Sequence, residues 1–297
     1  MFQIKPDGKA GYIDKTGRII VPPQFDYGYE FYEGLAAVEK DGKWGYIDSE
    51  GKLAIPLTLP NGYYFANGLA RIEINGKYGF INRRGQIVIN PRFDSVWMFS
   101  EGVADVVVNH KAGYIDKTGK FVIPPRFEWA SSFSEGMARV IFRDKEYYIN
   151  KTGRIVARFP KSVTAIDLFF SEGLAGVRVG EKWGFVNKLG RFVIPPRFGE
   201  PGPFSEGLAA VPIGDSDGYI DKTGKVIIPA KFDSAYSFSE GLARVRVDGK
   251  YGYINKSGAF VVKPVYDQAW GFSGGLADVI IGDKRGYINH EGTFIWP

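Results

Sequence analysis

The strongest constraint on the fold of this chain is an internal repeat. The string Gly-Tyr-Ile-Asp recurs in exact or close form at nine positions, which begin at Gly11, Gly45, Gly79, Gly113, Tyr147, Gly184, Gly218, Gly252 and Gly286. Consecutive copies lie 34 residues apart, apart from an interval of 37 residues between Tyr147 and Gly184. Repeats at such constant spacing pack on one another and grow by addition. We therefore predict a single repeat domain over residues 1–297, whose ninth repeat lacks its connector.

Each repeat contains the pattern of a β-hairpin. Candidate strand 35–40 is followed by Asp41-Gly42 and a second candidate strand, 43–48. An Asp-Gly pair suits a type I′ turn, which requires positive φ at both central residues. An Asx-x-x-Gly turn, a third short strand and a connector ending in a Phe-x-Glu-Gly turn complete the repeat. The aromatic share of 15% and the 39 glycines also favour short strands joined by turns. We predict an all-β fold with about three short antiparallel strands per repeat.

The ends of the sequence bear on how the nine repeats are arranged. The chain begins at the first strand of a repeat and ends at the third, Phe294–Trp296. No strand is left over to complete a split blade, so we expect an open solenoid-like array. A closed propeller-like ring is the alternative, because closure removes exposed ends.

The hairpin register separates the two faces of each repeat. Ala36 is expected opposite Ile47 on one face, and Ala37 opposite Tyr46 on the other. The position of Ala36 is alanine in all eight repeats that contain it, which indicates a tightly packed face. The position of Tyr46 is always Tyr or Phe, which predicts a ring shared between repeats. The positions of Ala37 and Trp44 vary, which indicates solvent exposure or a contact specific to one repeat.

The stretch Lys-Trp-Gly-Tyr-Ile-Asp at 43–48 and its companion at 182–187 resemble the bacterial WG repeat, also called the KWG repeat. The surrounding Lys-Thr-Gly-Lys, Ile-Pro-Pro-x-Phe and Phe-Ser-Glu-Gly-Leu-Ala stretches match that family too, so the resemblance covers essentially the whole chain. It implies a β-rich repeat array used for interaction, and it supplies no catalytic residues. Only Trp44 and Trp183 keep the namesake tryptophan, which puts any role of that Trp in doubt.

Residues suited to catalysis or metal binding are scattered through the repeats. The two histidines, His110 and His290, fall in turns of different repeats, and the absence of cysteine excludes disulfides and thiolate sites. Glutamates such as Glu101 recur in most repeats, which indicates a turn or backbone-bonding role, since a glycosidase needs only one carboxylate pair. The Asx residues, flanked by lysine in most repeats, form a poor calcium site. We predict that the chain is not an enzyme and holds no cofactor or metal.

Charge and hydropathy restrict the partners. The net charge of +5 is spread along the chain without a run of like charges, so no nucleic-acid partner is expected. No apolar stretch has the length of a membrane span. No signal peptide is visible in Met1–Lys5, which favours the cytoplasm without fixing the compartment. The oligomeric state is not indicated.

Aromatic residues form the candidate binding site. One group occupies the variable position of the second strand, at Trp44, Tyr78, Trp183 and Tyr251. A second group lies on the connector, two residues before its Phe or close to that place, at Tyr29, Tyr63, Trp97, Trp129, Tyr236 and Trp270. Such rings can stack on a partner, or they can cover the junctions between repeats. We predict a non-catalytic scaffold for macromolecular recognition, with another protein as the partner. The alternative is a carbohydrate- or cell-envelope-binding module.

One repeat departs from the pattern. The repeat around residues 143–170 has three extra residues, and its segment 159–167 is expected to bulge locally as a variant connector. It contains the carboxylates Asp144, Glu146 and Asp167 but no histidine. An enzymatic function would be sought there first.

Overall fold

The computed structural model describes residues 1–157, 159, 162–167 and 169–296. It divides into two compact units, Met1–Ile155 (unit 1) and Val156–Pro297 (unit 2), which are described separately. The described residues form nine small antiparallel sheets and one short 3-10 helix, η1. The all-β class and the tandem organisation in repeats of about 34 residues are therefore confirmed.

Unit 1 contains the first five sheets, ordered β1-β2-β3, β4-β5-β6-β7, β8-β9-β10, β11-β12-β13-β14 and β15-β16-β17-β18, and the unit boundary falls within β18. Its elements are β1 (Phe2–Ile4), η1 (Pro6–Gly8), β2 (Ala10–Ile13), β3 (Ile19–Phe25), β4 (Tyr27–Gly28), β5 (Leu35–Lys40), β6 (Lys43–Asp48), β7 (Leu53–Leu59), β8 (Leu69–Ile74), β9 (Lys77–Asn82), β10 (Ile87–Phe93), β11 (Ser95–Val96), β12 (Val103–Val108), β13 (Lys111–Asp116), β14 (Phe121–Phe127), β15 (Trp129–Ala130), β16 (Met137–Phe142), β17 (Lys145–Asn150) and β18 (Ile155–Ala157).

Unit 2 contains the other four sheets, ordered β19-β20-β21-β22, β23-β24-β25, β26-β27-β28-β29 and β30-β31-β32-β33. Its elements are β19 (Val163–Ile166), β20 (Leu174–Val179), β21 (Lys182–Asn187), β22 (Phe192–Phe198), β23 (Leu208–Ile213), β24 (Ser216–Asp221), β25 (Val226–Phe232), β26 (Ser234–Ser239), β27 (Leu242–Val247), β28 (Lys250–Ile254), β29 (Phe260–Tyr266), β30 (Gln268–Ala269), β31 (Ala277–Ile281), β32 (Lys284–Ile288) and β33 (Phe294–Trp296).

The central hairpin of each sheet has the predicted register. In the β5–β6 pair, Ala36 lies opposite Ile47 and Ala37 lies opposite Tyr46. Asp41 and Gly42 have φ values of 52° and 71°, so both central turn residues are left-handed, as a type I′ turn requires. The hairpin prediction is therefore confirmed.

The connector contributes a strand that the sequence pattern did not reveal. Strand β11 follows directly after β10, the last strand of the preceding sheet, and pairs with β12 through Val96 and Val106. The chain thus passes from the last strand of one sheet to the first strand of the next. Six of the nine sheets in the described residues have four strands, and three have three. The expectation of about three strands was too low because two-residue strands such as β11 carry no recognisable alternation.

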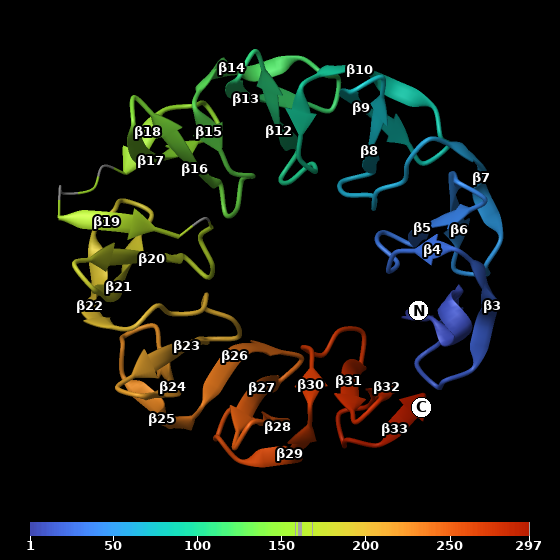
Figure 1. Ribbon diagram of the computed structural model, residues 1–297. Coiled ribbons are helices and arrows are strands. Elements are labelled where there is room, and N and C mark those ends of the chain that lie inside the picture. Colours follow the sequence, from blue (N-terminus) through green and yellow to red (C-terminus); the bar gives the residue numbers. More distant parts are fainter. Residues whose placement is uncertain (158, 160–161, 168, 297) are drawn as a thin grey trace. The chain divides into compact units, whose positions relative to one another are not determined.

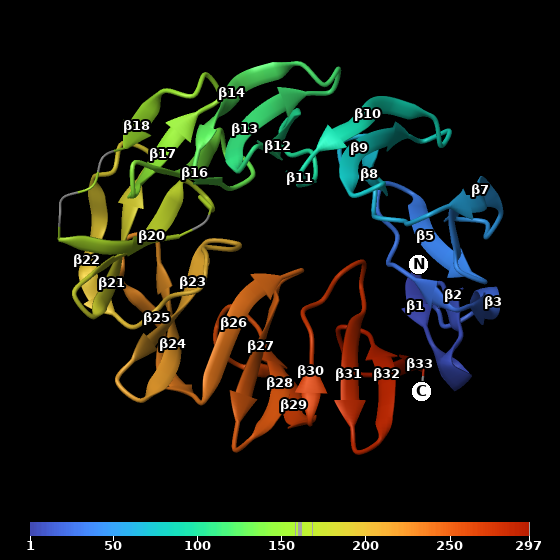
Figure 2. The ribbon, with the colours of Figure 1, turned by 45° about the horizontal axis from the view of Figure 1, so that its top comes forward.

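Successive sheets within each unit pack face to face (Figure 1, Figure 2). Ala36 and Ile47 share one cluster with Tyr12 of the preceding sheet, while Ala37 and Tyr46 share another with residues of the following sheet. Within each unit, every repeat forms its own small sheet, and an inner sheet such as β4–β7 has both faces covered by its neighbours, as the blades of a β-propeller do. The expected packing of each repeat on its neighbours is confirmed within each unit, but the sheets have the form of propeller blades, which was the stated alternative to the solenoid-like array.

A large ring and a small side chain meet at every such seam. The Tyr46 ring shares a cluster with Ala70 of the next sheet, and Tyr114 does the same with Ala138. All four residues are fully buried. The Tyr46 hydroxyl also donates to the Tyr63 carbonyl at 2.6 Å, and burial raises the pKa of Tyr46 to about 12. The predictions of a tightly packed alanine face and a shared structural ring are both confirmed.

The glycine of the Gly-Tyr-Ile-Asp string is required by close backbone approach. A Cβ atom on Gly113 would lie 2.6 Å from the Ile123 carbonyl oxygen of β14, well inside contact distance. The fifth repeat carries Tyr147 in this place, and part of the segment that follows its strand β18 lies outside the described residues.

The variant connector is partly described. Val163–Ile166 forms β19, whose register against β20 shifts between Val163 and Ala165, as at a β-bulge. Pro160 and Lys161 of the expected bulge lie outside the described residues.

Candidate functional site

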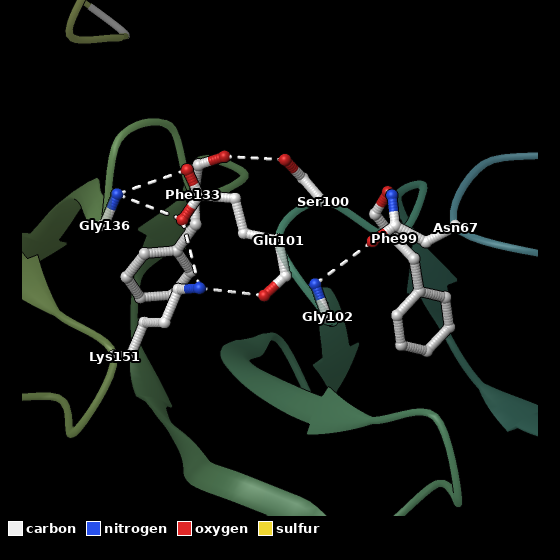
Figure 3. A network of polar contacts seen from close by, with 8 residues as sticks. All are labelled: Asn67, Phe99, Ser100, Glu101, Gly102, Phe133, Gly136 and Lys151. Atoms are coloured by element: carbon white, nitrogen blue, oxygen red, sulfur yellow. Dashed lines mark hydrogen bonds and ion pairs between the residues drawn. The ribbon is translucent and has the colours of Figure 1, made fainter.

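Within each unit, the Phe-x-Glu-Gly turns form a row in which the glutamate of one turn binds the backbone of the next. Glu101 and Gly102 have positive φ values, 52° and 87°, and the Glu101 carboxylate accepts from the Gly136 N–H at 3.0 and 3.2 Å (Figure 3). We call these turns and the residues that bind their glutamates the turn row. Equivalent bonds join Glu33 to Gly68, Glu172 to Gly207, Glu206 to Gly241 and Glu240 to Gly275.

A basic side chain completes each tie. The Lys151 Nζ lies 3.1 Å from the Glu101 carboxylate and donates to the Glu101 carbonyl at 2.8 Å (Figure 3). Lys222 pairs with Glu172 in the same way at 2.8 Å. The hydrogen bond from Lys222, helped by the Gly207 N–H, holds the pKa of Glu172 below its ordinary value. The backbone-bonding role predicted for the recurring glutamates is confirmed, and the bond runs to the following repeat.

The two histidines lie in turns, as predicted. His110 has a φ of 62° in its hairpin turn. His290 takes the place that Lys151 and its equivalents take elsewhere, with its Nε2 3.4 Å from the Glu240 carboxylate and its ring stacked on Phe272 at 4.4 Å between ring centroids. It is therefore part of the turn row and more than turn filler.

A second recurring feature lies on the variable face of the hairpins. Three arginines, Arg71, Arg139 and Arg244, occupy the position of Ala37 in their repeats. Their guanidinium carbons lie over aromatic rings, a geometry that stabilises the cation. The distances to ring centroids are 3.8 Å from Arg71 to Tyr63, 5.6 Å from Arg71 to Trp97, 5.6 Å from Arg139 to Trp129, 3.6 Å from Arg244 to Tyr236 and 5.5 Å from Arg244 to Tyr251. We call these residues the arginine–aromatic surface.

Each of the three arginines has a buried hydrogen-bond donor that is left unpaired. The Nε atom of each is buried and has no hydrogen-bond partner. Arg71 and Arg244 each donate one Nη1 bond to a carbonyl oxygen of the next sheet, that of Val96 and that of Ala269. A buried donor without a partner is unfavourable by about 1–3 kcal/mol, so such positions call for an explanation beyond stability.

One open pocket lies on this surface. Its volume is about 380 Å³, and its lining residues come from β27, β28 and the segment at β30: Arg244, Arg246, Tyr251, Asp267, Gln268, Ala269 and Trp270. Asp267 accepts from the Lys250 ammonium and from the Gly282 N–H. Its negative charge is therefore already compensated, and its pKa is held below the ordinary value by the Lys250 hydrogen bond.

The predicted site residues divide into three groups. Trp97, Trp129, Tyr236 and Trp270 are exposed, as expected for the connector group, and Trp97 most so, at 55%. Trp183 is buried at 8%, so its expected exposure is wrong. It lies on the same face of its sheet as Phe185, and that face packs against the next sheet. Trp44 is half-buried and stacks on Tyr29 with 5.6 Å between centroids, and Tyr78 is also half-buried.

The structure brings together only part of the predicted set. Tyr251 and Trp270 line the same pocket, and Tyr236 lies against Arg244 beside it. The arginines were missed as site residues, although the sequence carried their signal in the variable position of Ala37. The position of Ala37 was expected to be exposed to solvent or to make a contact specific to one repeat. The arginines at this position make contacts with aromatic rings in their own surroundings.

Asp105 occupies the same position as the arginines. Its Oδ1 accepts from the Ser132 Oγ at 2.8 Å. Burial raises the pKa of Asp105 to about 6, and the Ser132 bond offsets only part of that effect.

Within residues 1–157, 159, 162–167 and 169–296, no group of three or more His, Asp or Glu side chains is placed to hold a metal ion. The same residues include no helix with the length and apolar character that a bilayer span requires.

The stacked four-stranded sheets and their repeated seams define a β-repeat protein with propeller-type blades. Eight consecutive segments match the WG containing repeat, at residues 11–44, 44–78, 78–111, 113–145, 148–183, 183–215, 218–251 and 251–284. The chain belongs to the WG repeat family, as the sequence resemblance indicated. No curated protein matches it.

The chain is similar to several solved structures at low sequence identity, and one of them shares the fold. A structure described as "Crystal structure of the eukaryotic initiation factor" has a TM-score of 0.69 and 13% identity, covering 98% of this chain and 93% of the other. Apo AztD from Citrobacter koseri has a TM-score of 0.47 and 12% identity, covering 88% of this chain and 92% of the other. Kluyveromyces lactis Hsv2 has a TM-score of 0.43 and 8% identity, covering 83% and 89%. At such identities the first of these supports the fold alone.

Proposed function

We propose that this protein is a non-catalytic repeat scaffold that binds another protein through its arginine–aromatic surface. The observation that carries the proposal is the recurrence, in three repeats, of an arginine that lies over an exposed aromatic ring. Trp, Tyr and Arg dominate the binding energy of protein interfaces because they combine large apolar area with directed polar groups.

The alternative, a carbohydrate-binding module, receives less support. Sugars stack on open aromatic faces, and here guanidinium groups occupy faces of Tyr236 and Tyr63 at 3.6 and 3.8 Å. A non-enzymatic role is supported by the recurring glutamates, whose carboxylates are engaged by backbone N–H groups and lysines. Turnover of a substrate that is abolished by Asp167→Asn would overturn that part of the proposal.

Closure of the nine sheets into a ring is also part of the proposal. It is supported by the blade-like packing inside each unit, since blades that cover both faces leave exposed faces only at the ends of an open array. Small-angle scattering tests closure directly: a compact ring gives a maximum dimension well below that of an extended array of nine sheets.

The binding proposal is tested by partner capture with matched variants. The variant with Trp97→Ala, Trp129→Ala and Trp270→Ala and the wild type are each cross-linked to the proteins that they bind, and the complexes are purified. The control carries Phe121→Ala, Leu189→Ala and Val265→Ala, which remove exposed apolar side chains elsewhere. We expect a specific partner protein to be lost from the first variant and retained by the control. Equal capture by both, or a glycan-array signal lost only with the tryptophans, overturns the proposal.

A further inference from the structure

The pocket between the β27–β28 hairpin and β30 has positive charge that the chain leaves uncompensated. Arg244 and Arg246 both line it, and within the described part of the chain neither has a carboxylate at ion-pair distance. The lining carboxylate, Asp267, is held by Lys250. The nearby carboxylate of the next hairpin, Asp278, is held by Arg285, whose Nε lies 3.0 Å from each of its oxygens. Two guanidinium groups thus face an open pocket without a counter-charge.

In other repeats, an arginine on this face of the hairpin has a carboxylate partner that Arg244 does not have. In the repeat of Arg139, the second-strand position equivalent to Tyr251 is Glu146, and its carboxylate forms an ion pair with Arg139. In the last repeat the two signs are exchanged, and Asp278 pairs with Arg285 across the same two positions. In the repeat of Arg244 the partner position is Tyr251, an aromatic ring. The chain itself therefore identifies a carboxylate as the group that fits beside Arg244.

The two arginines differ in a way that suits binding. Arg244 is held against the Tyr236 ring and by the Ala269 carbonyl, so its orientation is fixed before any ligand arrives. Arg246 is exposed, with its guanidinium carbon 5.8 Å from the Tyr251 ring, and can move to complete a bidentate contact. Guanidinium groups bind carboxylates through paired N–H donors, which fixes both position and direction. The Trp270 ring, 42% exposed at the pocket edge, supplies an apolar surface for the neighbouring residue of a ligand.

We propose that this pocket binds an acidic peptide, with a carboxylate of Asp, Glu or the chain terminus on Arg244 and Arg246 and an adjacent apolar residue against Trp270. The inference rests on the proposed function and names the chemistry of the partner at one site. A nucleic acid fits less well, because backbone binding needs a track of several cations, whereas this pocket presents two beside a carboxylate.

The experiment measures binding of fluorescent 12-residue peptides that contain Glu or Asp beside an aromatic residue, each paired with its Gln or Asn counterpart. Two variants of the full chain are compared with the wild type, Arg246→Gln and Tyr251→Glu. The second places a carboxylate where Glu146 stands in the Arg139 repeat, so it fills the site from within. We expect both to weaken binding of acidic peptides by about tenfold or more, and Lys263→Gln on exposed β29 to leave it unchanged. Thermal melting of each variant confirms folding.

The outcomes separate this inference from the broader proposal. Equal affinity for acidic and amide peptides, or full binding by Arg246→Gln and Tyr251→Glu, overturns the acidic-peptide site. Stronger competition by a single-stranded oligonucleotide than by any acidic peptide overturns it in favour of nucleic acid. If the peptide experiment fails but the wild type captures a partner that the tryptophan variant does not, the recognition function stands and the acidic-peptide site is rejected.

Discussion

The turn row and the arginine–aromatic surface recur with the same spacing but follow opposite rules. In the turn row, each glutamate finds its partners inside the chain, as Glu101 does with Gly136 and Lys151. On the arginine–aromatic surface, the residue beside the arginine changes from repeat to repeat, and at Arg244 the carboxylate partner is missing. The glutamate, whose partners are internal, recurs in most repeats, whereas the residue beside the arginine differs from one repeat to the next, in keeping with the binding role that we propose for it.

The largest expected effect on the free energy of unfolding comes from a substitution at a close contact between two backbone segments. Gly113→Ala places a Cβ 2.6 Å from the Ile123 carbonyl oxygen, and neither backbone segment can move without disturbing the sheet. We expect a loss of about 1–3 kcal/mol in the free energy of unfolding. Chemical denaturation measures it. Gly271→Ala is the control, since its new Cβ meets no atom within 4 Å, and a similar loss there would contradict the explanation by crowding.

Asp105 tests whether the variable position carries a stability cost. Its pKa in the folded protein is about 6, above that of an exposed carboxyl, so the folded state holds a proton that the unfolded state has released. The cost is complete above pH 6 and disappears as the pH falls toward 4. The pKa difference corresponds to about 3 kcal/mol at pH 7, and burial of the neutral Asn amide retains part of that cost. Asp105→Asn should therefore raise the unfolding free energy at pH 7 by about 1–2 kcal/mol and change it little at pH 4. A gain that is the same at both pH values would show that ionisation is not the cause.

Glu101→Gln tests the turn row with a smaller change. The amide keeps an acceptor for the Gly136 N–H but loses the charge that pairs with Lys151. The pair is partly exposed, so we expect a loss of about 0.5–1 kcal/mol that shrinks as salt is added. Denaturation at low and high ionic strength measures it, and Glu181→Gln in an exposed hairpin turn is the matched control. A loss independent of salt would assign the effect to the backbone bond.

The smallest effect on stability is expected at the recognition surface. Trp97 is 55% exposed, and Trp97→Ala should change the unfolding free energy by less than about 0.5 kcal/mol. Thermal melting measures it. A cost well above 1 kcal/mol would place Trp97 in the framework and would weaken the contrast between the two regions.

Local pairing was predictable because it depends on residues close in sequence. The Asp41-Gly42 turn fixes the register of Ala36 against Ile47, and alternation then assigns each residue to a face. What covers each face was not predictable in the same way. The chemical variety at the position of Ala37 suggested solvent, yet Ala37 itself is buried because the next sheet covers it.

The candidate site shows the same limit. The exposed connector rings, such as Trp97 and Trp270, could be found from their spacing. The pocket could not, because Arg244 and Trp270 come from different sheets and meet only through the seam between them. Trp183 looked like a surface residue for the same reason: its burial depends on a neighbouring sheet that the hairpin pattern does not specify.

The chain passes from β10 directly into β11, and so from the last strand of one sheet to the first strand of the next. This connection has a genetic consequence. Any stretch of 34 residues contains the strands of one complete sheet, whichever residue it starts from. Unequal recombination between equivalent codons of two repeats therefore adds or removes one whole sheet and keeps its contact with the neighbouring sheet. Duplication and loss can therefore change the length of the array without creating a half-built fold. Each copied repeat also brings its own variable position, on which a new binding preference can be selected.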